Sequence, residues 1–124
     1  MNWLITGGCG FIGTSLAKKL LSDKSEKHNI RILDNLSTGR RSDLLAISSF
    51  NEITDLSNLC KSPDGLELVI GDVLDDNLAY LIVKNIDIIV HLAANTGVGP
   101  SVDDPRSDCH INVIGTFNYL DAAR

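Results

Sequence analysis

The 124-residue sequence predicts an α/β protein with a doubly wound, parallel sheet. Three observations predict this class. Four short runs are too continuously apolar for a sheet that has one face in water. Helical patterns separate these runs, so that each pair of strands has a helical crossover. A glycine-rich turn, TGGCGFIG at residues 6–13, stands where the first strand would become the first helix.

The expected strands are β-branched or leucine-rich runs of strand length. They cover residues 2–6 (NWLIT), 30–34 (IRILD), 66–71 (LELVIG) and 86–94 (IDIIVHLAA). Because each run is apolar along its whole length, we expect buried, parallel strands with helices on both faces of the sheet.

Two helices are expected between these strands. Residues 11–22 carry apolar side chains near helical spacing, and residues 75–85 begin with Asp75 or Asp76, either of which suits a helix start. A final helix is expected over residues 106–124, where apolar residues at steps of three form a stripe: Ile111, Ile114, Phe117 and Leu120.

Residues 41–64 are less regular. Two short helices are expected there, over 42–50 and 54–60, closed by a turn in SPDG. Their expected N-terminal caps are Ser42 or Asp43 for the first and Thr54 or Asp55 for the second.

Composition limits the classes of function. The chain is 44% hydrophobic and can bury a hydrophobic core about the size of one domain, so we expect one domain or less. Its net charge is −5 and its basic residues form no long run, so we expect no nucleic-acid partner. No apolar stretch approaches the roughly 20 residues that a membrane helix needs, and the charge-poor start is unlike a signal peptide. A soluble, cytoplasmic protein without membrane contact is therefore expected.

The cysteines point to the same compartment. Cys9, Cys60 and Cys109 are odd in number and lack C-x-x-C spacing, so we expect reduced thiols. Neither His28 nor His91 has a plausible metal-binding partner in the sequence, and no metal site is expected.

The glycine turn predicts a phosphate-binding element. Gly8-x-Gly10-x-x-Gly13 follows a predicted strand and opens a predicted helix. Glycine there permits a tight turn, close approach of the backbone to a pyrophosphate, and contact between helix and strand. Free N–H groups at the helix start would then face the anion.

Asp34 supplies the second part of a dinucleotide fingerprint. It ends the next predicted strand, 21 residues after Gly13, close to the roughly 20 expected for the carboxylate that binds an adenosine ribose. A carboxylate there favours NAD, because a 2′-phosphate would meet like charge. Arg40 and Arg41 follow closely enough to leave NADP open as the alternative.

Five motifs resemble those of one enzyme family. TGGCGFIG, LDNLSTG, GDV, HLAA and NVIGT occur in the order and approximate spacing of the extended short-chain dehydrogenase/reductase superfamily. Within it they are most similar to the NAD-dependent nucleotide-sugar epimerases and dehydratases, such as UDP-glucose 4-epimerase. The resemblance covers essentially the whole chain and implies a Rossmann-like doubly wound sheet, truncated after about four strands.

The resemblance also implies which residues bind the cofactor. The first motif is then G-x-x-G-x-x-G. The implied site residues are Gly7, Gly10, Phe11, Ile12 and Gly13 at the pyrophosphate, Asp34, Asn35, Ser37, Thr38 and Gly39 at the ribose, Asp72 and Val73 at the adenine, and Leu92, Ala93, Ala94, Thr96 and Asn112 along the rest of the cofactor.

Some of these residues have plainer interpretations. Asp72 could equally cap the following helix, and Asn112 could be a surface or structural hydrogen-bonding residue. Ala93 and Ala94 are small at the end of a strand, which could leave room for a ring. His91 lies in an apolar run and is expected to be a packed strand residue rather than a general base.

Tyr80 and Lys84 have the Y-x-x-x-K spacing of the superfamily's catalytic pair. In the family that pair follows a fifth strand, beyond NVIGT, so we expect Tyr80 to belong to an ordinary amphipathic helix. No catalytic residue is therefore assigned within the chain. Residues 1–124 are expected to be the N-terminal part of an NAD(P)-binding Rossmann domain, with the catalytic pair and the substrate domain absent.

By resemblance, the intact protein would take a hydride and a proton from a nucleotide-sugar substrate, through a keto intermediate, in an epimerase or dehydratase reaction. A homo-oligomer is expected as well. The 124 residues alone would be inactive. Two alternatives stay open: a related NAD(P)-dependent reductase of a non-sugar carbonyl, and a non-catalytic dinucleotide-binding module.

Overall fold

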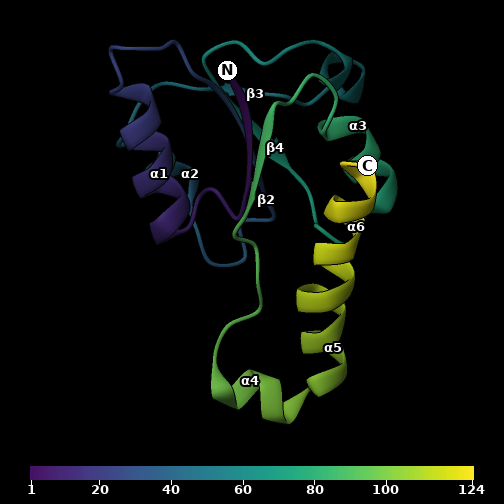
Figure 1. The fold of residues 1–124 in the computed structure, drawn as a ribbon. Helices are drawn as coiled ribbons and strands as arrows, with labels where there is room; N and C mark the ends of the chain where they lie inside the picture. The colour runs from purple at the N-terminus through teal and green to yellow at the C-terminus, as the bar shows by residue number, and fades with distance from the viewer.

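The computed structural model describes residues 1–124 as one parallel sheet with helices on both faces (Figure 1). The sheet order is β3-β4-β2-β1-β5, and every neighbouring pair is parallel. The strands are β1 (Asn2–Thr6), β2 (Asn29–Asp34), β3 (Asn51–Glu52), β4 (Leu66–Ile70) and β5 (Ile88–His91). The predicted doubly wound parallel sheet is confirmed, with all four predicted strands present.

Helices cover the sheet from two sides. One side carries α1 (Phe11–Leu21) and α2 (Arg41–Leu45), and the other carries α3 (Asp76–Ile82) and α6 (Gly115–Ala122) (Figure 1). The remaining elements are a 3₁₀ helix (Leu56–Cys60), α4 (Val98–Asp103), α5 (Pro105–Cys109) and a π-helical turn (His110–Ile114) that joins α5 to α6. None of these helices is long and apolar enough to cross a membrane.

The core consists of two apolar layers, one on each face of the sheet. Ile5 and Ile32 pack with Ala17 on the α1 side, whereas Leu4 and Leu33 pack on the α3 and α6 side. Each buried leucine or isoleucine stabilises the fold by about 1.5–3 kcal/mol relative to an exposed one. Successive side chains of β1 and β2 point into opposite layers, and both layers are buried. This explains why these strands are apolar along most of their length.

The segment between β2 and β4 differs from the expectation. The helix expected over 42–50 ends at Leu45, and β3 follows it as an unpredicted fifth strand. Asp43 is not a cap but lies in the first turn of α2, where its carboxylate accepts the Arg40 N–H at 3.1 Å. Asp55 caps the 3₁₀ helix, as one of the two predicted residues. A polar, two-residue strand has no periodicity that a sequence pattern could reveal.

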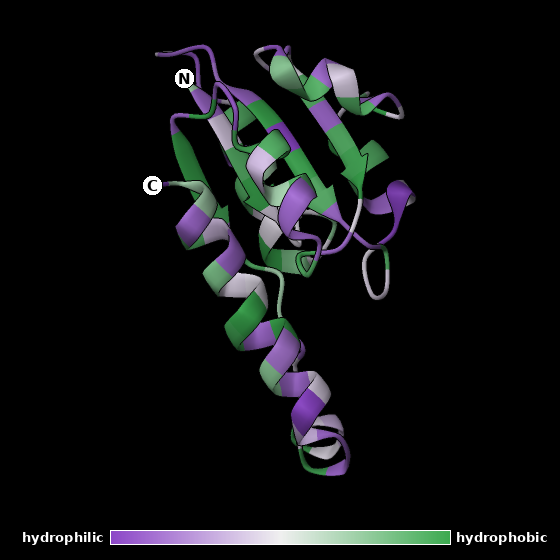
Figure 2. Ribbon diagram, turned by 90° about the vertical axis from the view of Figure 1, so that its right-hand side faces the viewer, coloured by the Kyte–Doolittle hydropathy of each residue, from purple (hydrophilic) through white to green (hydrophobic).

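Most of the apolar stripe expected on the final helix is exposed. Ile114, Phe117 and Leu120 are 44%, 59% and 69% exposed. The helix packs instead through Gly115, where a Cβ atom would lie 2.8 Å from Val73, and through two further buried residues, Asn118 and Tyr119. The helical rod that ends in α6 projects well beyond the sheet, so much of its surface has no neighbour (Figure 2).

Candidate functional site

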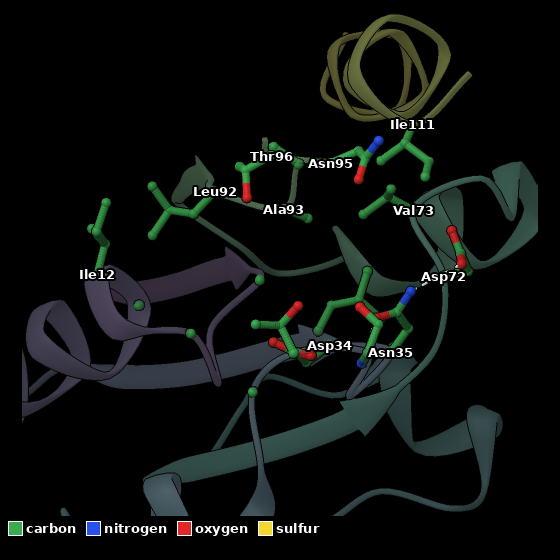
Figure 3. Close-up of a pocket in the computed structure, with 18 of the residues that line it drawn as sticks. Ile12, Asp34, Asn35, Asp72, Val73, Leu92, Ala93, Asn95, Thr96 and Ile111 are labelled. Carbon is green, nitrogen blue, oxygen red and sulfur yellow. Dashed lines mark hydrogen bonds between the residues drawn. The ribbon is translucent and has the colours of Figure 1, made fainter. Parts of the chain in front are cut away.

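A cleft of about 400 Å³ lies at the carboxyl ends of β1, β2, β4 and β5 (Figure 3). This is the edge at which open α/β sheets bind ligands. All of the predicted site residues except Asn112 line the cleft. Four further residues line it that were not predicted: Leu33, Gly71, Asn95 and Ile111.

The glycine turn forms one wall. Gly7 has a φ of +64°, and a Cβ atom there would lie 2.7 Å from the backbone nitrogen of Ala93. A Cβ atom on Gly13 would lie 2.5 Å from the Cα of Gly8, so only glycine lets α1 begin this close to the turn. The first-turn N–H groups of α1 have no intrahelical acceptor and open to the cleft beside Ile12.

Asp34 is the last residue of β2, and its carboxylate faces the cleft (Figure 3). It is only 8% exposed. Its two oxygens accept backbone N–H groups from Cys9 and Leu36, each at 2.8 Å. These bonds orient the carboxylate and leave lone pairs free to accept ligand hydroxyls. Leu36 reaches this arrangement with a φ of +57°, a strained value for a residue with a side chain.

The third wall links the ends of β2 and β4. The Asn35 amide donates to the Asp72 carboxylate at 3.2 Å (Figure 3). Asp72 also accepts the Leu74 N–H at 3.0 Å, whereas α3 is capped by Asp75, which accepts the Leu78 N–H at 2.9 Å. Of the two interpretations left open for Asp72, helix capping is therefore wrong, and the carboxylate is available to the cleft.

The fourth wall is the segment that follows β5. The Thr6 hydroxyl accepts N–H groups from Leu92 and Ala93, at 3.1 and 3.2 Å, and so fixes the start of this segment. Asn112 fixes its other end, because its side-chain amide accepts the Asn95 N–H at 2.7 Å and donates to the Asn95 carbonyl at 3.0 Å. Asn112 thus acts as a clamp behind the wall, which is the structural role left open for it.

Sequence motifs could have identified three of the four unpredicted lining residues, but not the fourth. Leu33, Gly71 and Asn95 each adjoin a residue that the motifs did identify. Ile111 comes from the π-helical turn, and only the packing of that turn brings it to the cleft (Figure 3).

Two candidate reactive groups lie outside any catalytic arrangement. Burial, with the nearby Asp34 charge, raises the pKa of the Cys9 thiol to about 12, so this cysteine is a poor nucleophile at neutral pH. Tyr80 is half-exposed on α3 and donates to Asp121 of α6, away from the cleft. Lys84 lies 3.8 Å from the Cys60 sulfur instead of pairing with Tyr80. Tyr80 lies on the exposed face of a helix, α3, and neither residue lines the cleft.

Comparison with known proteins identifies the family. The family model for GDP-mannose 4,6 dehydratase matches residues 4–124. The chain belongs to this family. This match confirms the resemblance that the glycine turn and the later motifs indicated.

Two curated relatives and one solved structure illustrate the similarity. UDP-glucose 4-epimerase from Mycolicibacterium smegmatis is 37% identical over the whole chain, which covers 35% of that relative. dTDP-glucose 4,6-dehydratase from Mycobacterium tuberculosis is 34% identical, again over the whole chain and 33% of the relative. The dTDP-glucose 4,6-dehydratase DesIV from Streptomyces venezuelae, solved with NAD and TYD bound, matches 99% of the chain and 35% of its own, at 30% identity and a TM-score of 0.79.

The chain spans about a third of the length of the curated relatives that it matches. The shared third contains the glycine turn, the acidic strand end and the segment after β5, which are the walls of the cleft.

Proposed function

We propose that the cleft binds NAD, with the pyrophosphate at the start of α1 and the adenosine ribose at Asp34. The observation that carries this proposal is the buried Asp34 carboxylate, which two backbone N–H groups orient toward the cleft beside the glycine turn. An oriented carboxylate accepts the two ribose hydroxyls of NAD and repels a 2′-phosphate. The match to a dehydratase solved with NAD bound supports the same cofactor.

The lining residues fit such a ligand. A Cβ atom on Gly13 would collide with the turn at Gly8, and one on Gly7 would collide with the backbone of the segment after β5. Glycine at both positions therefore allows the close packing that leaves backbone N–H groups accessible to a pyrophosphate. Asn35 and Asp72 offer an amide and a carboxylate where an adenine amino group would lie. Ala93 and Ala94 keep the wall after β5 low enough for a ring.

We further propose that the intact protein is a nucleotide-sugar epimerase or dehydratase, in which bound NAD accepts a hydride from a sugar carbon. The relatives that share its cofactor-binding third are named for UDP-glucose and dTDP-glucose reactions. Because the Tyr80 and Lys84 side chains lie outside the cleft, the 124 residues alone would bind cofactor without turnover. The cytoplasmic location stays a prediction.

Titration calorimetry of the 124-residue chain with NAD and NADP tests the cofactor assignment. We expect NAD to bind more tightly than NADP, and Asp34→Ala to weaken NAD binding by roughly tenfold or more, about 1.4 kcal/mol. Asp34→Asn keeps one acceptor and should weaken NAD less. Asp64→Ala is the matched control, since Asp64 is exposed and pairs only with Lys27, outside the cleft. Equal NAD affinity in Asp34→Ala and the wild type would refute the assignment.

We also propose that two copies of the chain associate through β5 and α6. The strand β5 pairs only with β1, so one of its edges carries free N–H and C=O groups along Ile88–His91. The neighbouring α6 exposes Phe117 and Leu120. Sedimentation at several concentrations should show a dimer that Phe117→Lys dissociates. A wild-type monomer at high micromolar concentration would contradict this assembly.

A further inference from the structure

Glu52, on the short strand β3, forms an ion pair with Arg41. The Glu52 carboxylate accepts from Nε and Nη2 of Arg41, both at 2.8 Å, in a two-point ion pair. The pKa of Arg41 is raised and that of Glu52 is lowered, because each charge stabilises the other through these hydrogen bonds. Backbone pairing of β3 with β4 fixes where Glu52 stands.

Arg41 belongs to the ribose end of the candidate site. It begins α2, two residues after Gly39, which lines the cleft. A Cβ atom on Gly39 would collide with the carbonyl oxygen of Cys9. Cys9 in turn donates its N–H to Asp34. The positive charge of Arg41 lowers the pKa of the Cys9 thiol, against the larger effect of burial, so the field of this arginine reaches the ribose end.

An arginine at this place could bind a 2′-phosphate. NADP sites characteristically place an arginine where it can pair with that phosphate through two parallel hydrogen bonds. In this protein the corresponding two donors of Arg41 already have carboxylate partners on Glu52. The carboxylate also cancels the positive potential that would attract a phosphate.

We propose that Glu52 is a specificity-determining residue of the NAD site: by engaging Arg41, it denies a 2′-phosphate its cationic partner. Asp34 and Glu52 then act together, the first by repelling the 2′-phosphate and the second by occupying the nearby arginine. This inference rests on the proposed function of the cleft.

Glu52→Gln in the 124-residue chain tests the inference, with calorimetric titration of both cofactors. The variant keeps the size of the side chain, and β3 pairs through its backbone, so the fold should persist; circular dichroism checks this. We expect NADP to bind roughly five- to tenfold more tightly than to the wild type, and NAD affinity to change less than about twofold. The gain for NADP should shrink as salt is added.

Three control variants assign the gain to Arg41. Adding Arg41→Gln to Glu52→Gln should abolish it. Adding Arg40→Gln should leave it, because Arg40 is exposed and forms no ion pair in the structure. Asp64→Asn removes the same charge from the segment before β4, outside the cleft, and should leave both affinities unchanged.

The outcomes separate the two proposals. Unchanged NADP affinity in Glu52→Gln, with NAD binding intact, would overturn the role of Glu52, and so would a gain that survives removal of Arg41. A wild-type chain that binds no NAD would overturn the proposed function of the cleft, and this inference with it.

Discussion

Two pairs of polar side chains lie opposite each other on neighbouring strands, yet they are satisfied very differently. Arg31 of β2 faces Glu67 of β4, and Thr6 of β1 faces His91 of β5. Both pairs are on the side of the sheet that α3 and α6 cover. Arg31 donates to the carbonyl of Ile82 in α3, and the His91 ring lies beside the Tyr119 ring of α6.

The arginine pair is satisfied by several partners. The side chain of Arg31 is 1% exposed, and its Nε donates to Glu67 at 2.9 Å. Its terminal nitrogens donate to three backbone carbonyls, those of Leu59, Ile82 and Lys61, at 2.9–3.3 Å. One buried cation thereby joins the sheet to α3 and to the 3₁₀ helix.

The histidine pair is incomplete. The Thr6 hydroxyl already accepts two N–H groups, so its own proton is the one that goes to Nδ1 of His91, at 2.8 Å. The ring then carries its proton on Nε2, which is buried without a partner. The hydroxyl of Tyr119, whose ring centroid is 5.4 Å from that of His91, is buried without a partner as well.

The difference shows what burial requires of each kind of group. A charged side chain inside the protein costs several kcal/mol unless it is paired and hydrogen-bonded, and each of the three guanidinium nitrogens of Arg31 has at least one acceptor. A neutral donor left without a partner costs only about 1–3 kcal/mol, which a well-packed core can tolerate. The polar groups beside β5 are therefore less completely hydrogen-bonded than those between β2 and β4.

Replacing the cation should have the largest effect. Arg31→Ala leaves Glu67 buried without its partner and frees three carbonyls, so we expect a loss of about 3–5 kcal/mol in the free energy of unfolding. Urea denaturation followed by circular dichroism measures it. A loss below about 1 kcal/mol would mean that water replaces the guanidinium, and that the two pairs do not differ as described.

Lowering the pH should reduce stability through the unpaired His91, by an amount between those of the two substitutions. Burial lowers the pKa of His91 below its ordinary value of 6.5, so the unfolded chain binds a proton that the folded chain does not. The stability that the neutral His91 contributes is fully present above pH 6.5 and is lost as the pH falls below that value. The free energy of unfolding then falls by at most about 1.4 kcal/mol per pH unit. Urea denaturation at pH 7, 6 and 5 measures the slope, which His91→Gln should flatten; an equal slope in the variant would exclude His91 as its source.

Removing the unpaired hydroxyl should have the smallest effect. Tyr119→Phe deletes a buried group that has no partner, so stability should stay within about 1 kcal/mol of the wild type, or rise. The pKa of this phenol is raised by burial and by Asp75 and Asp72, as expected for a hydroxyl that stays protonated. A loss greater than about 1 kcal/mol would show that the hydroxyl has a partner, such as a bound water.

Local spacing explains why so much of the cleft was predictable. The tight turn at Gly7–Gly13 and the acidic end of the second strand depend on residues close in sequence, and the carboxyl ends of parallel strands meet at one edge whatever packs elsewhere. The same reasoning did not find the strand β3 or the partners of Arg31, which lies within an otherwise apolar run.

By itself, then, the sequence determined the order of strands and helices, the glycine turn and the acidic end of β2, because hydrophobic periodicity and glycine placement are local properties. Tertiary structure alone decided which partners polar groups found. Arg31 could be buried only because carbonyls of two distant segments meet it, Asn112 clamps Asn95 only through a π-helical turn, and Glu52 reaches Arg41 only because β3 joins the sheet edge. Such pairings depend on contacts between segments far apart in the chain, and no local pattern encodes them.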